Sequence, residues 1–187
     1  MDFRNAVILV TGGGTGIGLE LARRFESMGA QVYICGCRQE PLDAASQAHN
    51  LKAIMADITK AEDQKRLLED IRRTHGRLDL LVNNAAILGA YDFAEAPTED
   101  AVRRIESEIS INATAPLTLI SRALALHRAS QNPAVLLIGS SVAYVPIAGT
   151  PIYFGTKAVI HHAAAALSHQ LAPLGISVIE ALPPVID

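Results

Sequence analysis

The chain has 187 residues and a net charge of -3, and its acidic and basic residues are spread along it without a basic run. This distribution argues against nucleic acid or an anionic membrane as a partner. Half of the residues are apolar, and no repeat or change of composition divides the chain, so we expect one domain that spans residues 1–187.

Short apolar runs alternate with longer segments of helical periodicity. The runs predict six strands, at residues 6–12, 31–35, 51–57, 78–85, 134–140 and 176–182. The periodic segments predict helices near residues 16–28, 39–48, 60–74, 98–131 and 151–173. Strict alternation of the two predicts an α/β fold, a doubly wound parallel sheet with helices on both faces. Ligands bind such sheets beyond the carboxyl ends of the strands, so the residues that follow each strand are candidate site residues.

Two features indicate the compartment. The N-terminal stretch MDFRNAVILVTGG holds an apolar run that is too short for a signal-peptide core or a membrane span. Cys35 and Cys37 lie one residue apart in a predicted strand, where a disulfide between them would be strained. We therefore expect a cytoplasmic protein with reduced thiols, and no metal site, because no second cysteine pair or nearby histidines complete one.

A glycine-rich loop, TGGGTGIGLELARRF at residues 11–25, follows the first predicted strand. Its glycines let the backbone turn sharply, and the helix that follows presents free N–H groups and the positive end of its dipole to a pyrophosphate. The alternative is a loop that serves only close packing of strand and helix. Its position after the first strand, opening a helix, favours a dinucleotide site.

Tyr153 and Lys157 lie four residues apart in the predicted helix PIYFGTKAVIHHAAAAL, at residues 151–167. Side chains at this spacing share one face of a helix, so the phenol and the ammonium can reach a common point. Taken alone, the pair is more often a lysine stem that covers a core aromatic ring.

The combination of three motifs resembles the short-chain dehydrogenase/reductase family, and the resemblance covers essentially the whole chain. The motifs are Thr-Gly-x-x-x-Gly-x-Gly with Gly12, Gly16 and Gly18, then NNAA at 83–86 and YFGTK at 153–157. The resemblance implies a Rossmann-like sheet with strand order 3-2-1-4-5-6 and an NAD(P)-dependent oxidoreductase that interconverts a carbonyl and an alcohol. Family members usually continue into a substrate loop and a seventh strand, which we expect to be absent from residues 1–187.

The family's catalytic residues fall, by this resemblance, on Asn112, Ser140, Tyr153 and Lys157. Tyr153 is then the general acid or base, Ser140 holds the substrate oxygen and Lys157 binds the nicotinamide ribose. An adjacent ammonium and the charge of the oxidised nicotinamide favour the phenolate, so we expect Lys157 to lower the pKa of Tyr153. Ser141 competes with Ser140, and both serines are otherwise ordinary turn residues. Asn112 is otherwise a mid-helix polar residue.

The family's cofactor-binding positions carry over in the same way. They fall on Gly12, Gly14, Thr15, Gly16, Ile17, Gly18, Arg38, Asp57, Ile58, Asn83, Ala85, Tyr153, Lys157, Pro183 and Ile186. Asp57 is the expected adenine contact, although an aspartate there also suits a turn or a helix cap. Asn83 is expected to support the central sheet and to face the cofactor.

The choice between NADP and NAD depends on the stretch CGCRQE after the second strand. Gly36 stands where an NAD-binding acid would be, and Arg38 is available for the 2′-phosphate of NADP. These two residues favour NADP, while a solvated Arg38 and use of NAD are nearly as well supported.

The expected partner is a small carbonyl or alcohol substrate, with the apolar segments 87–97 and 142–151 at the mouth of the site. Relatives pair through the two long helices, so a homodimer or a homotetramer is expected. Two alternatives remain open: a dinucleotide-binding or assembly protein with little turnover, and an isomerase or dehydratase that keeps its cofactor bound.

Overall fold

The computed structural model describes residues 2–94, 98–145 and 147–183. Its strands are β1 (Val7–Thr11), β2 (Gln31–Gly36), β3 (Lys52–Met55), β4 (Leu80–Asn83), β5 (Ala134–Ile138) and β6 (Ser177–Ala181). Its α-helices are α1 (Gly16–Ser27), α2 (Gln39–Ala48), α3 (Ala61–His75), α4 (Glu99–Ile109), α5 (Ala115–Arg128) and α6 (Pro151–Leu171). Shorter helical pieces are the π-helix η1 (Ser110–Thr114) and the 3-10 turns η2 (Ser141–Ala143) and η3 (Ala172–Leu174).

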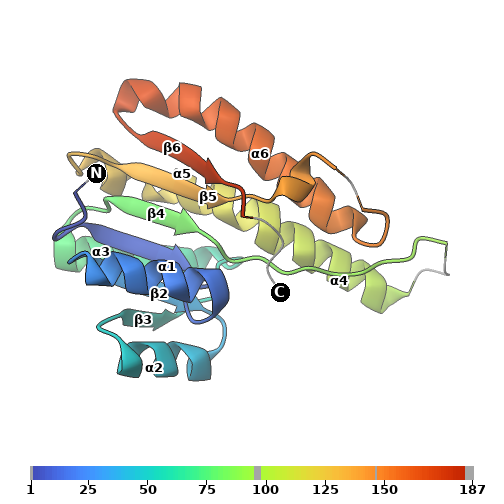
Figure 1. Cartoon of the computed structure of the whole chain (residues 1–187), viewed down its shortest axis with the longest axis horizontal. Coiled ribbons are helices and arrows are strands. Elements are labelled where there is room, and N and C mark those ends of the chain that lie inside the picture. Colours follow the sequence, from blue (N-terminus) through green and yellow to red (C-terminus); the bar gives the residue numbers. More distant parts are fainter. Residues whose placement is uncertain (1, 95–97, 146, 184–187) are drawn as a thin grey trace.

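The six strands form one parallel sheet in the order β3-β2-β1-β4-β5-β6, as the resemblance implied (Figure 1). The chain starts in the middle at β1, winds outward to β3, and then crosses back to β4 on the other side of β1. The carboxyl ends of β1 and β4 are therefore the switch point of the sheet, where such folds bind ligands.

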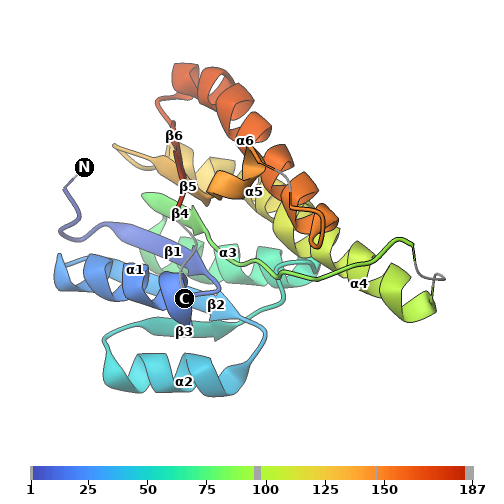
Figure 2. The same ribbon diagram turned by 45° about the vertical axis from the view of Figure 1, so that its right-hand side comes forward.

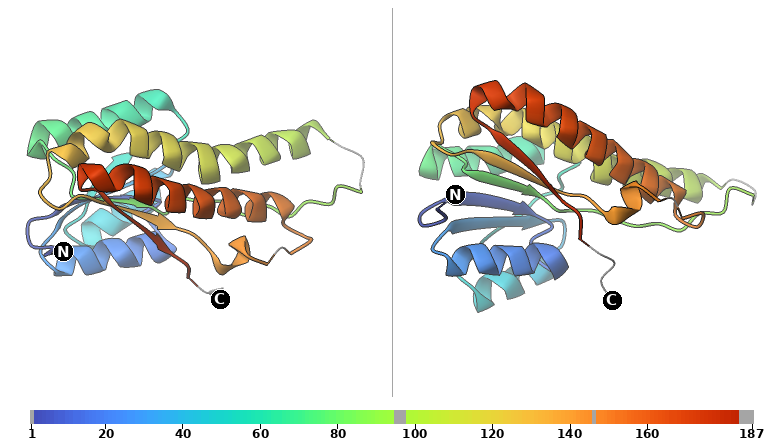
Figure 3. Two further views of the ribbon diagram at one scale, coloured as in Figure 1. Left: turned by 90° about the horizontal axis from the view of Figure 1, so that it is seen from above. Right: turned by 45° about the horizontal axis from the view of Figure 1, so that its top comes forward.

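Helices cover both faces of the sheet, which makes three layers (Figures 2 and 3). On one face α1 and α2 bury apolar residues such as Phe25 and Leu42 against β1 and β2. On the other, α3, α5 and α6 bury residues such as Leu67, Leu119 and Ile160. The apolar strands are thus packed from both sides, which is the reason they read as unbroken apolar runs.

The long helix expected at residues 98–131 is interrupted. It consists of α4, the π-helix η1 and α5 in continuous succession. A π-helix makes i→i+5 hydrogen bonds and accommodates one extra residue, often at a functional site. The whole stretch is long and apolar enough to cross a membrane by composition alone. Its apolar residues Leu119, Ile120 and Ala123 lie in the protein core, which accounts for that composition.

Candidate active site

The loop between β1 and α1 brings the start of a helix to the carboxyl edge of the sheet. Gly12 and Gly16 have φ values of 63° and 55°, in the left-handed region that glycine adopts without strain. A Cβ on Gly18 would lie 2.4 Å from the carbonyl oxygen of Gly12, so the helix can pack this closely only with glycine there. A Cβ on Gly16 would meet no described atom within 4 Å. Gly18 therefore serves close packing, whereas Gly16 borders open space.

The N-terminus of α1 is suited to an anion. Thr15 is the N-cap residue, and within the described part of the chain its side chain makes no capping hydrogen bond. The first turn also contains no acidic residue. Its N–H groups and the positive end of the helix dipole are thus available to a negatively charged group in the loop.

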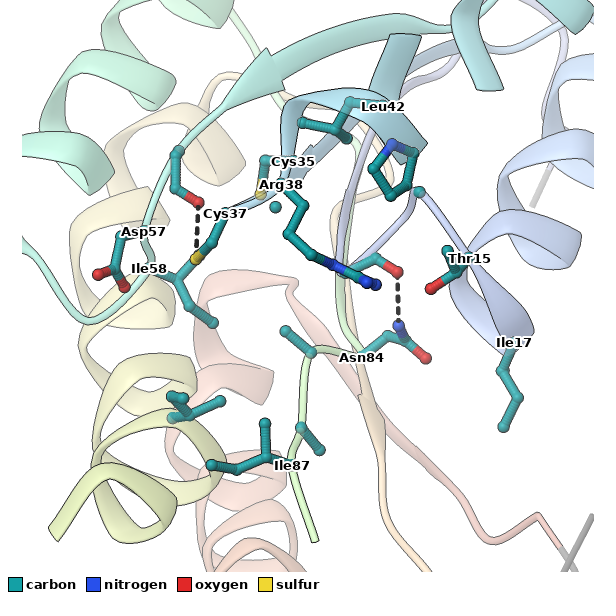
Figure 4. A pocket seen from close by; sticks show the side chains of 18 residues that line it. Thr15, Ile17, Cys35, Cys37, Arg38, Leu42, Asp57, Ile58, Asn84 and Ile87 are labelled. Atoms are coloured by element: carbon teal, nitrogen blue, oxygen red, sulfur yellow. Dashed lines mark hydrogen bonds between the residues drawn. The ribbon is translucent and has the colours of Figure 1, made fainter. Parts of the chain in front are cut away.

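A pocket of about 400 Å³ lies beside this loop, beyond the ends of β1, β2 and β3. Figure 4 shows the side chain of Arg38 extending across it toward the side that carries Thr15. Gly36 also lines the pocket, so the end of β2 contributes no carboxylate. Eight of the residues predicted from the sequence are in its lining: Gly12, Gly14, Thr15, Ile17, Arg38, Asp57, Ile58 and Ala85.

Asp57 combines two of the roles considered for it. Its Oδ1 accepts hydrogen bonds from the backbone N–H of Thr59 at 3.0 Å and from the Thr59 hydroxyl at 2.7 Å, so it organises the turn after β3. Its own N–H donates to Asp63 Oδ2 at 2.8 Å. Asp57 nevertheless lines the pocket, and the turn therefore fixes the orientation that it presents to a ligand.

A second pocket, of about 480 Å³, contains the residues expected to carry the chemistry. Ser140, Tyr153, Lys157 and Pro183 all line it. Ser141 instead begins η2 and is exposed, so the structure places Ser140 at the site. The two pockets share three lining residues, Ile17, Asn84 and Ala86. They therefore form one groove along the carboxyl edge of the sheet, from Arg38 at one end to Tyr153 at the other.

Lys157 is a buried lysine held against the sheet. Its Nζ donates a hydrogen bond to the carbonyl oxygen of Ile138 at 2.8 Å and lies 5.5 Å from the centroid of the Tyr153 ring. Burial lowers the pKa of Lys157 to about 8, while the negative charge of Glu180 opposes that fall. The ammonium group thus lies over the tyrosine ring, and Lys157 lines the groove.

The pKa of Tyr153 differs from the sequence prediction. Burial raises it, and the negative charge of Glu108 raises it further. The expectation that Lys157 lowers this pKa is therefore wrong for the protein's own groups. Both causes depend on the tertiary structure, since Glu108 is 45 residues away in sequence and 0% exposed.

Asn112 lies in the π-helix and supports the wall of the groove from behind. Its Oδ1 accepts from the N–H of Ile87 at 2.9 Å, and its Nδ2 donates to the carbonyl of Ile87 at 2.8 Å. Its Nδ2 also donates to Thr156 Oγ1 at 3.3 Å. Thr156 is the residue that precedes Lys157 in α6. Asn112 thus connects the segment after β4 to α6 without lining either pocket itself.

Glu108 is a buried residue that sequence reasoning missed. It lies one helical turn before Asn112, and it accepts hydrogen bonds from Tyr91 Oη at 2.7 Å and from the N–H of Gly89 at 3.3 Å. Tyr91 in turn donates its N–H to the carbonyl of Gly149, in the loop before α6, at 3.1 Å. Glu108 therefore holds together two segments at the mouth of the groove.

The two asparagines at the end of β4 have different positions from those expected. Asn83 is buried, its amide has no partner within the described residues, and it is absent from both pocket linings. Asn84 lines both pockets, and its Nδ2 donates to the carbonyl of Thr11 at 2.9 Å. The same Nδ2 donates to the carbonyl of Gly12 at 3.3 Å (Figure 4). Asn84, which was not predicted, is thus the asparagine that faces the groove.

The remaining predicted positions are accounted for as follows. Gly16 and Gly18 shape the loop without being in either pocket lining, and Ile186 lies outside the described residues. Burial raises the pKa of Cys35 to about 12 and also raises the pKa of Cys37, so neither thiol is activated. Within residues 2–94, 98–145 and 147–183, no group of three or more His, Cys, Asp or Glu side chains is placed to hold a metal ion.

Comparison with known proteins agrees with this geometry. A family model described as short chain dehydrogenase matches residues 6–187. The chain is 35% identical over 189 residues to a protein of Bacillus subtilis named "Uncharacterized oxidoreductase DltE", and the match covers all of this chain and 74% of that protein. It is 31% identical to "Oxidoreductase asL5" of Sarocladium schorii, over 91% of this chain and 68% of that protein.

Two solved structures share the fold. One, described as "Pseudomonas aeruginosa RhlG/NADP active-site complex", superimposes with a TM-score of 0.87 at 28% identity, over 100% of this chain and 75% of that one. The other is a short-chain dehydrogenase from Streptomyces avermitilis, with a TM-score of 0.88 at 29% identity, over 97% of this chain and 66% of that one. With the matching sheet order and family model, these similarities establish that the chain belongs to the short-chain dehydrogenase family of oxidoreductases.

Proposed function

We propose that this oxidoreductase interconverts a carbonyl and an alcohol by hydride transfer with NADP(H), with Tyr153 as the general acid or base. The observation that carries the proposal is the single groove that joins Arg38, the glycine loop and Tyr153. A groove with a cation at one end, an anion cradle in the middle and a phenol at the other end matches the order of the charged groups along a dinucleotide. The nicotinamide supplies the hydride, and the protein supplies placement and the proton.

The residues of the groove fit a dinucleotide. The open space beside Gly16 and the N-terminus of α1 would hold the pyrophosphate, and Asp57 and Ile58 would border the adenine. Lys157 would bind the nicotinamide ribose, with Pro183 beside the ring. These positions follow the order of the groups along such a cofactor.

Arg38 supports NADP over NAD. A 2′-phosphate needs a cation, and the exposed guanidinium of Arg38 extends across the pocket (Figure 4). The acid that would bind a free ribose diol and repel a phosphate is replaced by Gly36. The structurally similar Pseudomonas protein is described as an NADP complex, which agrees with this choice.

The chain's own residues account for the proton transfer. Tyr153, with its pKa above the ordinary value, is protonated at neutral pH and is therefore ready to donate a proton to the oxygen of a carbonyl. Ser140 lines the same pocket and would hold that oxygen by a hydrogen bond. The ammonium of Lys157 stabilises the phenolate that the transfer leaves behind. Asn112 supports the positions of these side chains through its hydrogen bonds to Ile87 and Thr156.

The substrate side of the groove is apolar. Leu88, Ile147 and Phe154 line the pocket around Tyr153 and Ser140. An apolar wall beside the hydroxyls of Tyr153 and Ser140 favours a carbonyl compound with an apolar substituent.

We also propose a cytoplasmic homo-oligomer. The apolar side chains of Val102 and Ile109 on α4 and Val159 on α6 are more than 40% exposed, on the helices through which pairing is expected.

Binding and turnover test the proposal in sequence. NADPH and NADH are titrated by fluorescence, and the protein is then assayed by loss of absorbance at the NADPH band with a panel of aliphatic and aromatic aldehydes and ketones. The expected result is tighter binding of NADPH and turnover of at least one apolar carbonyl. Absence of binding of both dinucleotides would overturn the proposal. Binding without turnover across the whole panel would favour a dinucleotide-binding protein instead.

A further inference from the structure

Glu180 and His161 form a partly buried pair near Lys157. Glu180 lies on β6, its side chain is 13% exposed, and its Oε2 is 2.7 Å from His161 Nδ1. Because an ionised carboxylate can only accept, His161 Nδ1 carries the hydrogen of this bond. His161 lies on α6 one turn after Lys157, so the histidine and the lysine project from the same helix toward the same part of the sheet.

The second oxygen of Glu180 points to the corner of the sheet that Lys157 also reaches. Oε1 is buried and, within the described part of the chain, has no hydrogen-bond partner. It lies 2.3 Å from the position that a Cβ on Gly139 would take. Lys157 Nζ donates to the carbonyl of Ile138, the residue before Gly139. Carboxylate and ammonium therefore approach adjacent residues, Gly139 and Ile138, at the end of β5, without forming a direct ion pair among the described residues.

No other carboxylate occupies this corner in the described residues. The titratable groups near Glu180 and its partner His161 are Lys157 and His162 on α6 and Tyr144. The His162 ring centroid lies 5.2 Å from that of His161, and Tyr144 Oη lies 3.2 Å from His161 Nδ1. The neighbouring strand β5 has the sequence AVLLI and contributes no charge. On the groove side Lys157 faces the neutral ring of Tyr153. Glu180 itself does not line the groove, so any effect on the reaction must pass through Lys157.

We infer that Glu180, oriented by His161, is a positioning residue that provides the negative charge needed to keep Lys157 an ammonium in its buried place. The inference rests on the proposed function for the role of that ammonium. The direction of the electrostatics supports it: burial lowers the pKa of Lys157 to about 8, and the charge of Glu180 raises it. Without Glu180 the lysine would lose its proton at a lower pH and could no longer stabilise a phenolate.

The pair also explains why residue 139 is glycine. A side chain there would occupy the place of Oε1 and would also lie 2.8 Å from Leu182 Cδ2, so Gly139 gives the carboxylate access to the corner. The φ of Gly139 is not positive, and an alanine is therefore compatible with the backbone. Gly139→Ala provides a way to move the charge of Glu180 without removing it.

The test measures the pKa of Lys157 directly by NMR titration of protein labelled at the lysine Cε. The chain has only four lysines, at positions 52, 60, 65 and 157, and the Lys157→Met variant assigns the resonance. The measurement needs neither cofactor nor turnover. We expect a pKa near 8 in the parent protein and a decrease of about half a unit or more in Glu180→Gln, which keeps the size of the side chain.

Glu62→Gln is the matched control, because Glu62 is exposed and pairs with Lys65. That variant should change the titration of Lys65 and leave Lys157 unchanged. In the pH profile of carbonyl reduction, Glu180→Gln should move the alkaline decrease to lower pH by the same amount as the pKa of Lys157. An unchanged pKa of Lys157 in Glu180→Gln would overturn the inference.

Two further outcomes have a defined meaning. If Glu180→Gln does not fold, as judged by circular dichroism, Gly139→Ala takes its place: a lower pKa of Lys157 supports the inference and an unchanged one overturns it. If the parent protein binds no dinucleotide and turns over no substrate, the proposed function fails. The pKa measurements then still decide whether Glu180 holds the charge of Lys157.

Discussion

Glu108 and Asn112, one turn apart on the interrupted helix, hold the same segment of chain. Asn112 binds both main-chain groups of Ile87, and Glu108 binds the N–H of Gly89 and the hydroxyl of Tyr91. The wall between β4 and the mouth of the groove is thus fixed at three successive places from one helix.

The charge of Glu108 should be measurable at Tyr153. Glu108→Gln removes a negative charge that raises the pKa of Tyr153, so this pKa should fall toward its ordinary value. In the alcohol-oxidation direction, which needs the phenolate, the rise in rate with pH should then begin at lower pH. Titration of protein labelled at the tyrosine Cζ checks the first effect and the pH profile the second. An unmoved Tyr153 resonance would mean that Glu108 acts only as a structural anchor.

Tyr153→Phe removes the proton donor and leaves the ring. Turnover should fall by about 100-fold or more, since general acid catalysis contributes at least that much. The affinity for NADPH, measured by fluorescence titration, should stay within a few-fold, because the hydroxyl group that is lost contributes little of the contact area. Turnover equal to that of the parent protein would contradict the assignment of Tyr153.

Arg38→Ala separates the two cofactors. If the guanidinium binds the 2′-phosphate, the variant should bind NADPH at least about 10-fold more weakly and NADH almost unchanged, as expected for loss of one charge-assisted contact. Calorimetric titration of both dinucleotides is the measurement. Arg128→Ala, an exposed arginine at the C-terminal end of α5, is the control and should alter neither affinity.

Lys157 should reduce the stability of the protein at neutral pH. Its pKa falls from 10.5 to about 8 on folding, so the folded protein binds protons less well than the unfolded chain does. The free energy of unfolding should therefore rise between about pH 8 and 10.5, as the unfolded chain also loses its proton. Lys157→Met should unfold with a free energy about 1–3 kcal/mol larger at pH 7, and this gain should shrink above pH 8.

Urea denaturation of the parent protein and Lys157→Met at pH 7 and pH 9.5 measures this effect. The same variant should lose turnover, which would show that the lysine is retained for function at a cost in stability. A variant that is less stable than the parent protein at pH 7 would mean that the hydrogen bond to Ile138 outweighs the burial of the charge.

Two glycine-to-alanine variants test the packing of the loop. In Gly18→Ala the new Cβ would lie 2.4 Å from Gly12 O and 2.5 Å from Asn84 Nδ2, so the loop must shift. We expect a loss of about 1–3 kcal/mol of stability and at least about 10-fold weaker NADPH binding. Gly155→Ala is exposed within α6, with no described atom within 4 Å of its Cβ, and should gain about 0.5–1 kcal/mol. Equal effects of the two variants would contradict the close approach at Gly18.

The sequence was informative where function depends on local order along the chain. Alternation of strands and helices was sufficient to predict the parallel sheet. The resemblance carried by the glycine loop, NNAA and YFGTK implied its strand order and the residues expected at the groove. Glu108 was missed because EDAVRRIESEI reads as a helix with an exposed charged face, and its burial depends on Tyr91 and Gly89. The His161–Glu180 pair was missed for a similar reason, since the two residues come from a helix and a strand that meet only in the folded protein.

Asn84 shows a limit of a different kind. Two adjacent asparagines stand at the end of β4, and consecutive side chains on a strand point to opposite faces. The motif NNAA locates the pair, but which member faces the groove depends on where the strand ends, which sequence patterns leave uncertain by a residue or two. Predicted strands in this chain were up to two residues longer at an end than those observed, and Asn83 lies within β4.

The π-helix between α4 and α5 allows one continuous helical segment both to support the groove and to pack on the sheet. One extra residue turns everything beyond it by about 100° relative to an uninterrupted α-helix. The side that carries Glu108 and Asn112 toward the groove is therefore out of phase with the side by which α5 packs on the sheet. Deletion of a single residue between Ser110 and Thr114 would restore the common phase, so that helix and core could both persist while the support of the groove rotated away from it.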